Sequence, residues 1–247
     1  MNARSTVSVV HVEDSSSASA KFYTVLVILG IKQTLNGVYE ITPDSGSAFF
    51  LRDEYLTCVS KERLLPVEGG LGGADSLFAD ESSLKPGMQG VFNEEESADI
   101  LSAALVFSAE RAAMTYLARA EHCRFMLKQK LLRKGIDKDS IEKSLDFLQR
   151  TGALDDVRFA GAWLRSRYIA HAEGRRKLEG ELLKRGISKE DAKAALDEFF
   201  TDHSESELCK RAYKKCLRVH KDPSKIYSSL QRLGFSGQQI KKAMASS

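Results

Sequence analysis

The chain has 247 residues, four cysteines and a formal net charge of +3 at pH 7. This length accommodates one large domain or two small ones with a buried core. The longest uncharged apolar run, FYTVLVILGI, has about half of the roughly 20 residues that a membrane span needs, and the first residues lack the pattern of a secretory signal. We therefore expect a cytoplasmic protein without a membrane span, whose cysteines, Cys58, Cys123, Cys209 and Cys216, stay reduced.

Charge divides unevenly along the chain. Residues 1–108 carry 7 Lys and Arg against 15 Asp and Glu, a net charge of −8, whereas residues 109–247 carry 30 against 19, a net charge of +11. A basic half of this size favours polyanionic partners, above all nucleic acid.

Residues 1–65 have a strand-like pattern. β-branched and aromatic residues dominate TVSVVHV, KFYTVLVIL, GVYEIT and SAFFLRDEYL, and small or polar residues separate these runs. The segment PDSG at 43–46 predicts a turn between two strands. We expect a small antiparallel β-rich region over residues 1–65 and a glycine-rich loop or linker over residues 66–91.

From Asn93 onward the pattern is helical. Asn93 precedes three glutamates, which suits the cap and the first turn of a helix, and no proline occurs between Pro86 and Pro223. We expect a connecting helix over residues 92–108 and helices through the rest of the chain.

Three segments of the helical part share one plan. They are LLRKGIDKDSI at 131–141, LLKRGISKEDA at 182–192 and LQRLGFSGQQI at 230–240. In each, a glycine (Gly135, Gly186, Gly234) is expected to end one helix in the left-handed conformation, and Asp137, Ser188 or Ser236 is expected to cap the next. With one more helix ahead of each pair, the pattern predicts a mostly α fold, with three tandem three-helix repeats over residues 109–153, 154–203 and 204–247 in an elongated, curved array.

The adjacent carboxylates Asp155 and Asp156 allow two interpretations. In GALDDVRFAGAWLRSR they follow a predicted helix end, so that Asp155 can cap the next helix and Asp156 can occupy its first turn. Phe159 and Trp163 then form an apolar stripe at helical spacing. We favour this architectural role. The alternative is acid/base or metal chemistry, for which the sequence supplies no evident partner group.

A second group of candidate ligands consists of Cys209, Cys216 and His220, which share one face of a predicted helix. Tyr213 lies on the same face, and a buried stripe of cysteine and aromatic residues is the commoner meaning of such a pattern. His122 and Cys123 are adjacent and therefore point apart on a helix. We expect no catalytic site, no metal and no cofactor.

Cationic residues are the strongest functional signal. Their density after residue 109 favours a surface for an anionic ligand, without the interleaved aromatic residues that stack on single-stranded bases. The candidate contact residues are Arg124, Arg133, Lys134, Arg158, Arg165, Arg167, Arg175, Arg176, Lys177, Lys184 and Arg185.

The GALDDVRFA junction, the EGRRKLEGELLKRGI helix end and the three glycine-punctuated repeats resemble the RecX family of bacterial regulatory proteins, which act on the RecA recombinase. The resemblance covers residues 109–247 and includes YLARAEHCRFMLKQKLLRKGI, which is similar to the first repeat of that family. It implies a non-enzymatic regulator that lies in the groove of the RecA–DNA filament. Such a regulator inhibits filament extension, ATP hydrolysis, strand exchange and co-protease activity, and its binding face is expected on the second repeat and its flanks.

An alternative function is a basic helical module that acts on DNA directly through the phosphates. The expected partners are thus the RecA filament and single- or double-stranded DNA, bound directly or through the filament. We expect a monomer that does not bind membranes.

Overall fold

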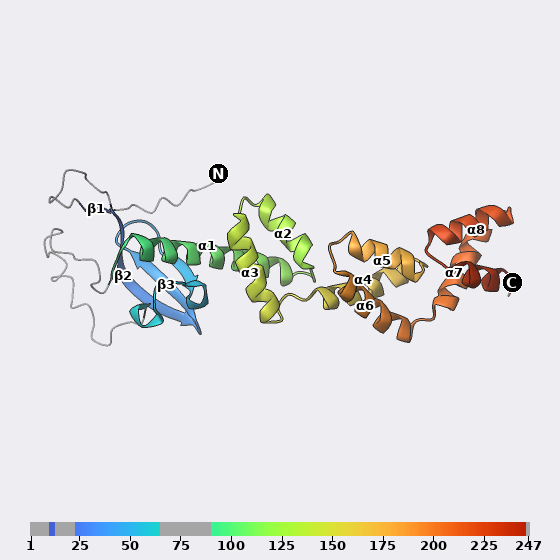
Figure 1. Ribbon diagram of the computed structural model, residues 1–247, viewed down its shortest axis with the longest axis horizontal. Helices are drawn as coiled ribbons and strands as arrows, with labels where there is room; N and C mark the ends of the chain where they lie inside the picture. Colours follow the sequence, from blue (N-terminus) through green and yellow to red (C-terminus); the bar gives the residue numbers. More distant parts are fainter. Residues whose placement is uncertain (1–9, 13–22, 65–89, 246–247) are drawn as a thin grey trace. The chain divides into compact units, whose positions relative to one another are not determined.

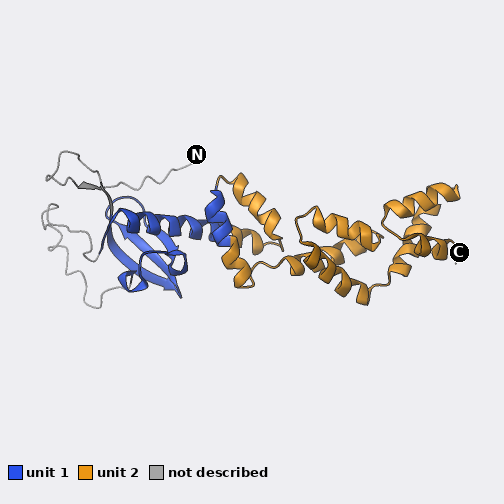
Figure 2. Ribbon diagram, in the orientation of Figure 1, with its two compact units in different colours: residues 1–112, 136–144 blue, residues 113–135, 145–247 orange. Residues whose placement is uncertain are grey.

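The structure is a computed structural model, and it describes residues 10–12, 23–64 and 90–245 (Figure 1). The loop predicted over residues 66–91 lies almost wholly outside the described residues, as does part of the strand predicted at TVSVVHV. The chain forms two compact units, which Figure 2 colours separately. Unit 1 comprises residues 1–112 and 136–144, and unit 2 comprises residues 113–135 and 145–247.

Unit 1 contains an antiparallel sheet whose central strand is β2 (Tyr23–Leu35). β2 pairs with β1 (Val10–Val12), β3 (Val38–Pro43) and β5 (Val91–Phe92), and β3 pairs with β4 (Phe49–Arg52). Gly37, with a φ of 71°, forms the tight turn between β2 and β3. Two short 3-10 helices, Asp53–Tyr55 and Lys61–Leu64, follow β4. The predicted antiparallel, β-rich region is confirmed for these residues.

Helix α1 (Glu94–Leu117) shares the core of unit 1 with the sheet. Its start is a capping box: the Glu96 N–H donates to the Asn93 side chain at 2.9 Å, and the Asn93 N–H donates to the Glu96 carboxylate at 3.0 Å. Ile100 and Ala103 are fully buried in the same cluster as Leu26 of β2. α1 therefore begins where the sequence places a helix and packs on the sheet through one face.

α1 runs without a break across residue 109, so the expected connecting helix is continuous with the first helix of repeat one. Among the described residues, α1 is also the one helix that length and composition would allow to cross a membrane. Its burial against the sheet identifies it as a core helix.

Asp99 of α1 holds the segment that follows β4. Its carboxylate accepts hydrogen bonds from the backbone N–H groups of Thr57, Cys58 and Val59 at 2.9 to 3.1 Å and from the Thr57 hydroxyl at 2.7 Å. Burial of Asp99 favours the neutral acid, but these hydrogen bonds outweigh burial and lower its pKa to about 2. A buried carboxylate with this many donors stabilises the local fold only in its charged form.

The remainder of the chain is helical and is grouped in threes. Repeat one contains the end of α1, α2 (Arg124–Arg133) and α3 (Lys138–Arg150), and it contributes residues to both units. Repeat two contains α4 (Asp156–Ala170), α5 (Arg175–Leu183) and α6 (Lys189–Asp202). Repeat three contains α7 (Glu205–Leu217), α8 (Pro223–Arg232) and α9 (Gly237–Ala245). The predicted mostly helical fold built from three-helix domains is confirmed.

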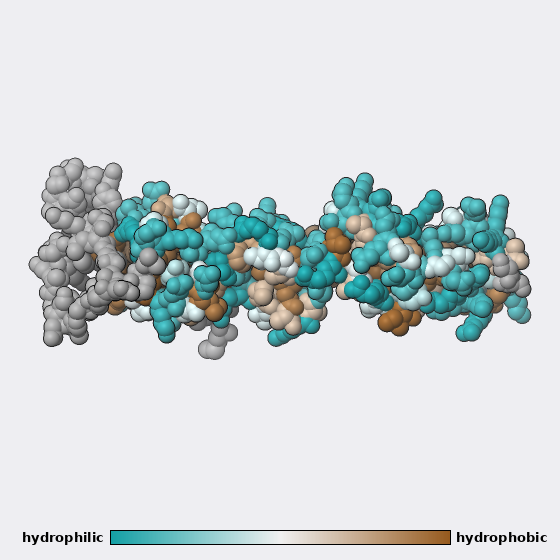
Figure 3. Space-filling view, turned by 90° about the horizontal axis from the view of Figure 1, so that it is seen from below, coloured by the Kyte–Doolittle hydropathy of each residue, from teal (hydrophilic) through white to brown (hydrophobic). Residues whose placement is uncertain are grey.

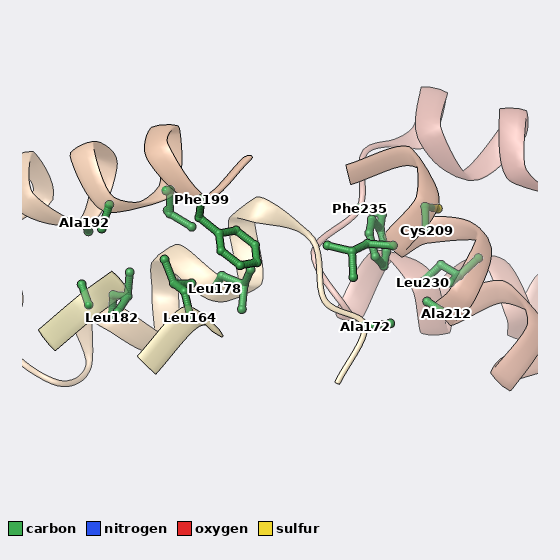
Figure 4. Packing of buried hydrophobic residues seen from close by; sticks show 14 of the residues in the cluster. Leu164, Ala172, Leu178, Leu182, Ala192, Phe199, Cys209, Ala212, Leu230 and Phe235 are labelled. Atoms are coloured by element: carbon green, nitrogen blue, oxygen red, sulfur yellow. The ribbon is translucent and has the colours of Figure 1, made fainter. Parts of the chain in front are cut away.

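One apolar core runs through repeats two and three. Figure 4 shows Leu164, Leu178 and Phe199 of repeat two, Ala172 of the α4–α5 loop, and Cys209, Ala212, Leu230 and Phe235 of repeat three. Cys123 of repeat one belongs to the same cluster and is fully buried. Because no repeat encloses its apolar side chains alone, the repeats stabilise one another through nearest-neighbour contacts.

Two hydrogen bonds recur at equivalent positions between successive repeats. The Arg124 N–H at the start of α2 donates to the Asp156 carboxylate of repeat two at 2.7 Å, and the Arg175 N–H at the start of α5 donates to the Glu205 carboxylate of repeat three at 2.9 Å. The residue before each donor contacts the next repeat as well, since the Cys123 thiol lies 3.2 Å from the Arg185 carbonyl. The Gly174 N–H donates to the Leu233 carbonyl at 2.8 Å. We call this set of contacts the repeat joint.

Two of the three repeat glycines allow close packing between repeats, which the sequence pattern does not reveal. Gly135, Gly186 and Gly234 all have positive φ angles, of 80°, 80° and 89°, which an alanine adopts only with strain. A Cβ at Gly186 would also lie 2.5 Å from the Phe125 Cβ, and one at Gly234 would lie 2.4 Å from the backbone nitrogen of Lys177. Nothing lies within 4 Å of a Cβ at Gly135. Gly186 and Gly234 therefore permit close approach of the preceding repeat.

Repeat three lacks the equivalent backbone donor. Pro223 stands where Arg124 and Arg175 donate their backbone N–H groups, and a proline has no such donor. The Asp222 side chain caps α8 by accepting from the Ser224 N–H at 2.9 Å. The start of α8 therefore has no backbone N–H at the position where α2 and α5 each donate to the next repeat.

Candidate interaction surface

Asp155 and Asp156, the paired carboxylates ahead of α4, have two different structural roles. The Asp155 side chain accepts from the N–H groups of Val157 and Arg158 at 2.8 and 2.9 Å and is the N-cap of α4. Asp156 belongs to the repeat joint, and burial raises its pKa, while the hydrogen bond from the Arg124 N–H acts in the opposite direction. Both carboxylates are therefore accounted for by the start of one helix and by the preceding repeat.

The cysteine and histidine side chains do not assemble a ligand set in the described part of the chain, where no group of three or more His, Cys, Asp or Glu is placed to hold a metal. Cys209 is buried in the core, and burial raises its pKa to about 11. Cys216 is partly buried, and burial raises its pKa as well. Both thiols are protonated near neutral pH, which disfavours them as nucleophiles.

Trp163 lies close to two guanidinium groups. The Arg185 Cζ is 4.6 Å and the Arg167 Cζ 5.5 Å from the centre of its ring system, within the range of cation–π attraction. Arg167 also forms a two-point ion pair with Glu173 at 2.7 and 3.0 Å. Trp163 packs against the core but is only partly buried, so it joins the apolar interior to the basic surface.

Glu181 of α5 forms ion pairs with three of the candidate cations. Its carboxylate accepts from Arg185 at 3.0 Å and from Lys177 and Lys184 at 3.2 Å each. Hydrogen bonds from Arg185, Lys184 and Lys177, in that order, lower the pKa of Glu181 to about 2. One carboxylate facing three cations leaves a local excess of positive charge on α5.

Further candidates are bound within or between the helices of unit 2. Arg124 pairs with Asp146 and Arg175 with Asp197, both at 2.7 Å and at equivalent positions of repeats one and two. Arg158 pairs with Glu121 at 2.7 Å. Its guanidinium also donates to the carbonyls of Gly152 and Ala153, in the turn between α3 and α4. These three arginines are positioned by structural contacts.

The remaining candidates are exposed. In the part of the chain that the structure describes, the side chains of Arg133, Arg165 and Arg176 form no ion pair or hydrogen bond. Lys134 is exposed as well, and its Nζ lies 5.0 Å from the centre of the Tyr116 ring. Because a cation without a carboxylate partner loses no ion pair when an anion binds, Arg133, Lys134, Arg165 and Arg176 are the candidates best placed to bind a polyanion.

Sequence reasoning missed other cations of this kind. Lys130 also lies over the Tyr116 ring, at 4.9 Å, and its Nζ contacts the His122 Nε2. In repeat three, three exposed cations at the end of α7 and just after it make no side-chain ion pair with a described residue, namely Lys214, Arg218 and Lys221. A search for cations without a carboxylate three or four residues away would have indicated some of them.

Figure 3 shows that hydrophilic residues cover most of one face of the helical repeats, with apolar residues in small groups.

Comparisons with known proteins match the helical part of the chain. The family model described as "RecX, first three-helix domain" matches residues 109–148, and the one described as "RecX, second three-helix domain" matches residues 155–196. A regulatory protein RecX from Treponema pallidum (strain Nichols) is 37% identical over 152 residues, which cover 62% of this chain and 93% of that protein. One from Pelodictyon phaeoclathratiforme is 33% identical over 138 residues, covering 53% and 84% of the two chains.

Two solved structures have a similar fold. A crystal structure of a regulatory protein RecX aligns with a TM-score of 0.64 and 20% identity over 89% of this chain and 99% of its own. The structure of RecX from Lactobacillus salivarius aligns with a TM-score of 0.51 and 24% identity over 57% of this chain and 96% of its own. At these identities the structures support the fold alone.

Proposed function

This chain belongs to the RecX family of regulatory proteins, and from that premise we propose that it binds the RecA–DNA filament in its groove. There it inhibits filament extension, ATP hydrolysis, strand exchange and co-protease activity in the cytoplasm. The match to both three-helix domains of the family is the observation that carries this proposal, because the matched residues include the contacts between repeats one and two and the basic helices α2, α4 and α5. As a member of a family of regulatory proteins, the chain is not an enzyme.

The contacts of unit 2 divide the candidate cations into paired and unpaired ones. Arg124, Arg158 and Arg175 hold helices and loops in place, whereas Arg165 and Arg176 of repeat two are exposed and unpaired in the described structure. We infer that the unpaired cations, rather than the paired ones, meet the anionic groups of the filament. A surface of this kind attracts a polyanion at long range, and the attraction falls as salt screens it.

Co-sedimentation with RecA filaments on single-stranded DNA tests the proposal. The double variant Arg165→Glu plus Arg176→Glu should weaken filament binding while leaving the unfolding curve unchanged, because both side chains are exposed. Lys225→Glu is the matched control, since Lys225 is an exposed cation of repeat three without a partner among the described residues. Equal loss with the control would contradict a binding face on repeat two.

Direct binding to DNA is the second candidate function, and the excess of unpaired cations favours it. In that case the affinity for bare DNA should match the affinity for the filament and should fall linearly with the logarithm of salt concentration, with a slope of about −0.7 per phosphate contact on single strands. Weak binding to bare DNA together with tight filament binding would exclude this alternative.

A further inference from the structure

Three cations of repeat two share one carboxylate, that of Glu181 in α5. The Nζ atoms of Lys177 and Lys184 lie 3.2 Å from it, and a guanidinium nitrogen of Arg185 lies 3.0 Å from it. The side chain of Glu181 is 17% exposed, whereas that of Lys184 is 72% exposed. An anion that reaches these cations from solvent therefore competes with Glu181 for the same N–H donors.

The fold of α5 depends little on these ion pairs. The Arg185 guanidinium also donates to the backbone carbonyl of Glu181 at 2.6 Å, and its Cζ lies 4.6 Å from the centre of the Trp163 ring system. Both contacts persist when the carboxylate is removed. The backbone N–H of Lys184 caps the end of α5 independently of its side chain. Since ion pairs at a surface contribute little to stability, the main effect of the Glu181 carboxylate is on the charge that α5 presents.

Other cations of repeat two have no such partner. Arg165 and Arg176 are exposed and form no ion pair with a described residue. A phosphate group can bind them without displacing a carboxylate. Glu181, in contrast, is tethered within one or two turns of its three cations and competes with a free phosphate at a high effective concentration.

We propose that Glu181 is an internal competitor that withholds its three cations from the phosphate groups of single-stranded DNA and so limits the affinity of repeat two for bare DNA. This inference rests on the proposed function, because it takes the basic surface of repeat two as the part that meets a polyanion. Carboxylate and phosphate oxygens both accept charge-assisted hydrogen bonds, so each cation serves one or the other. Binding to bare DNA then depends on the few unpaired cations.

The test measures the binding of a fluorescent oligothymidylate to the full chain and to two charge-matched variants. Glu181→Gln removes the carboxylate and keeps the size and helix propensity of the side chain. Glu179→Gln is the matched control, since Glu179 lies two positions away on α5, off the face of Glu181, and forms no ion pair or hydrogen bond with a described residue. Both variants change the net charge equally, so long-range attraction rises equally in both.

Local release of the three cations should distinguish the two variants. At about 50 mM salt, Glu181→Gln should bind at least about fivefold more tightly than Glu179→Gln, and its plot of log affinity against log salt should be steeper by about 0.7 for each cation that gains a phosphate. Glu179→Gln should keep the wild-type slope. Glu181→Ala, which also keeps high helix propensity, should show the same gain and guards against an effect of the glutamine itself.

A further variant tests whether the released cations are the cause. Lys184→Gln should cost the Glu181→Gln chain more affinity than it costs the wild-type chain, because Lys184 is free to bind phosphate only without Glu181. Equal affinities and slopes of the position 181 and 179 variants, or an equal cost of Lys184→Gln in both backgrounds, would overturn the proposal. Failure of the wild-type chain to co-sediment with RecA filaments would contradict the proposed function instead, and it would leave this comparison on oligothymidylate intact.

Discussion

Replacing Gly186 with alanine should weaken the repeat joint more than the same change at Gly135, although both glycines have a φ of 80°. The left-handed conformation costs an alanine about 1–2 kcal/mol at either position. At Gly186 the new methyl group would also lie 2.5 Å from the Cβ and 2.6 Å from the Cγ of Phe125, and overpacking of this kind adds about 1–3 kcal/mol. At Gly135 nothing lies within 4 Å of the new methyl group, so only the backbone strain remains.

Urea and thermal unfolding of the two variants measure this difference. We expect the free energy of unfolding to fall by about 1–3 kcal/mol more for Gly186→Ala than for Gly135→Ala, and about 1 kcal/mol corresponds to 2–4 °C in Tm for a chain of this size. Phe125→Ala removes the Cγ and Cδ1 contacts and should recover part of the extra loss in the double variant. Equal destabilisation by the two glycine changes would refute the claim that close approach at the joint requires glycine.

Three further predictions concern single carboxylates and their partners. Asp156→Asn keeps an acceptor for the Arg124 N–H and should change stability little, whereas Asp156→Ala leaves that donor without its partner and should lower the free energy of unfolding by about 1–3 kcal/mol, as measured by urea unfolding. Arg167→Ala should cost about 3–5 kcal/mol in the same assay, because it leaves the buried Glu173 without its ion pair. For Asp99, whose folded pKa of about 2 lies below the unfolded value of about 3.9, the stabilisation is fully present above pH 4 and is lost as the pH falls towards 2. Asp99→Asn should reduce this acid dependence in thermal unfolding curves recorded between pH 2 and pH 5.

Local sequence signals predict the helix ends well because the physics of a helix end is local. Gly135 and Gly186 adopt the left-handed conformation that ends a helix, and Ser188 accepts from the Asp191 N–H at 3.0 Å as an N-cap should. Asp155 likewise needs only the next three residues for its capping bonds. The antiparallel strands of unit 1 follow from runs of β-branched residues for the same reason.

The hydrogen bond of Asp156 to the preceding repeat could not be predicted, because its donor, the Arg124 N–H, lies 32 residues earlier in the chain. Its position in the first turn of α4 looks the same to sequence reasoning whether or not another repeat is present. The role becomes visible only when Glu205 is found to make the equivalent bond to the Arg175 N–H. The steric requirement for glycine at position 186 could not be predicted for the same reason, since the neighbour that excludes a side chain there is Phe125 of another repeat.

The candidate surface was the least predictable part of the molecule. All eleven candidates are cations between positions 124 and 185, and the structure divides them by whether a carboxylate reaches them. Pairs within one helix, such as Lys177 with Glu181, can be read from spacing, but Arg158 pairs with Glu121 across 37 positions. Trp163 was expected in an apolar stripe with Phe159, but its contact with the Arg185 guanidinium could not be predicted, because Arg185 lies 22 positions later, just after the end of α5.

We propose that this chain regulates RecA filaments through the unpaired cations of repeat two, Arg165 and Arg176. Filament length and ATP hydrolysis should be followed together while RecA assembles on single-stranded DNA with substoichiometric amounts of the protein. We expect shorter filaments and slower hydrolysis with the wild-type chain and with Lys225→Glu, and a much smaller effect with Arg165→Glu plus Arg176→Glu. Unchanged filament length and hydrolysis at a stoichiometric amount of the wild-type chain would contradict it.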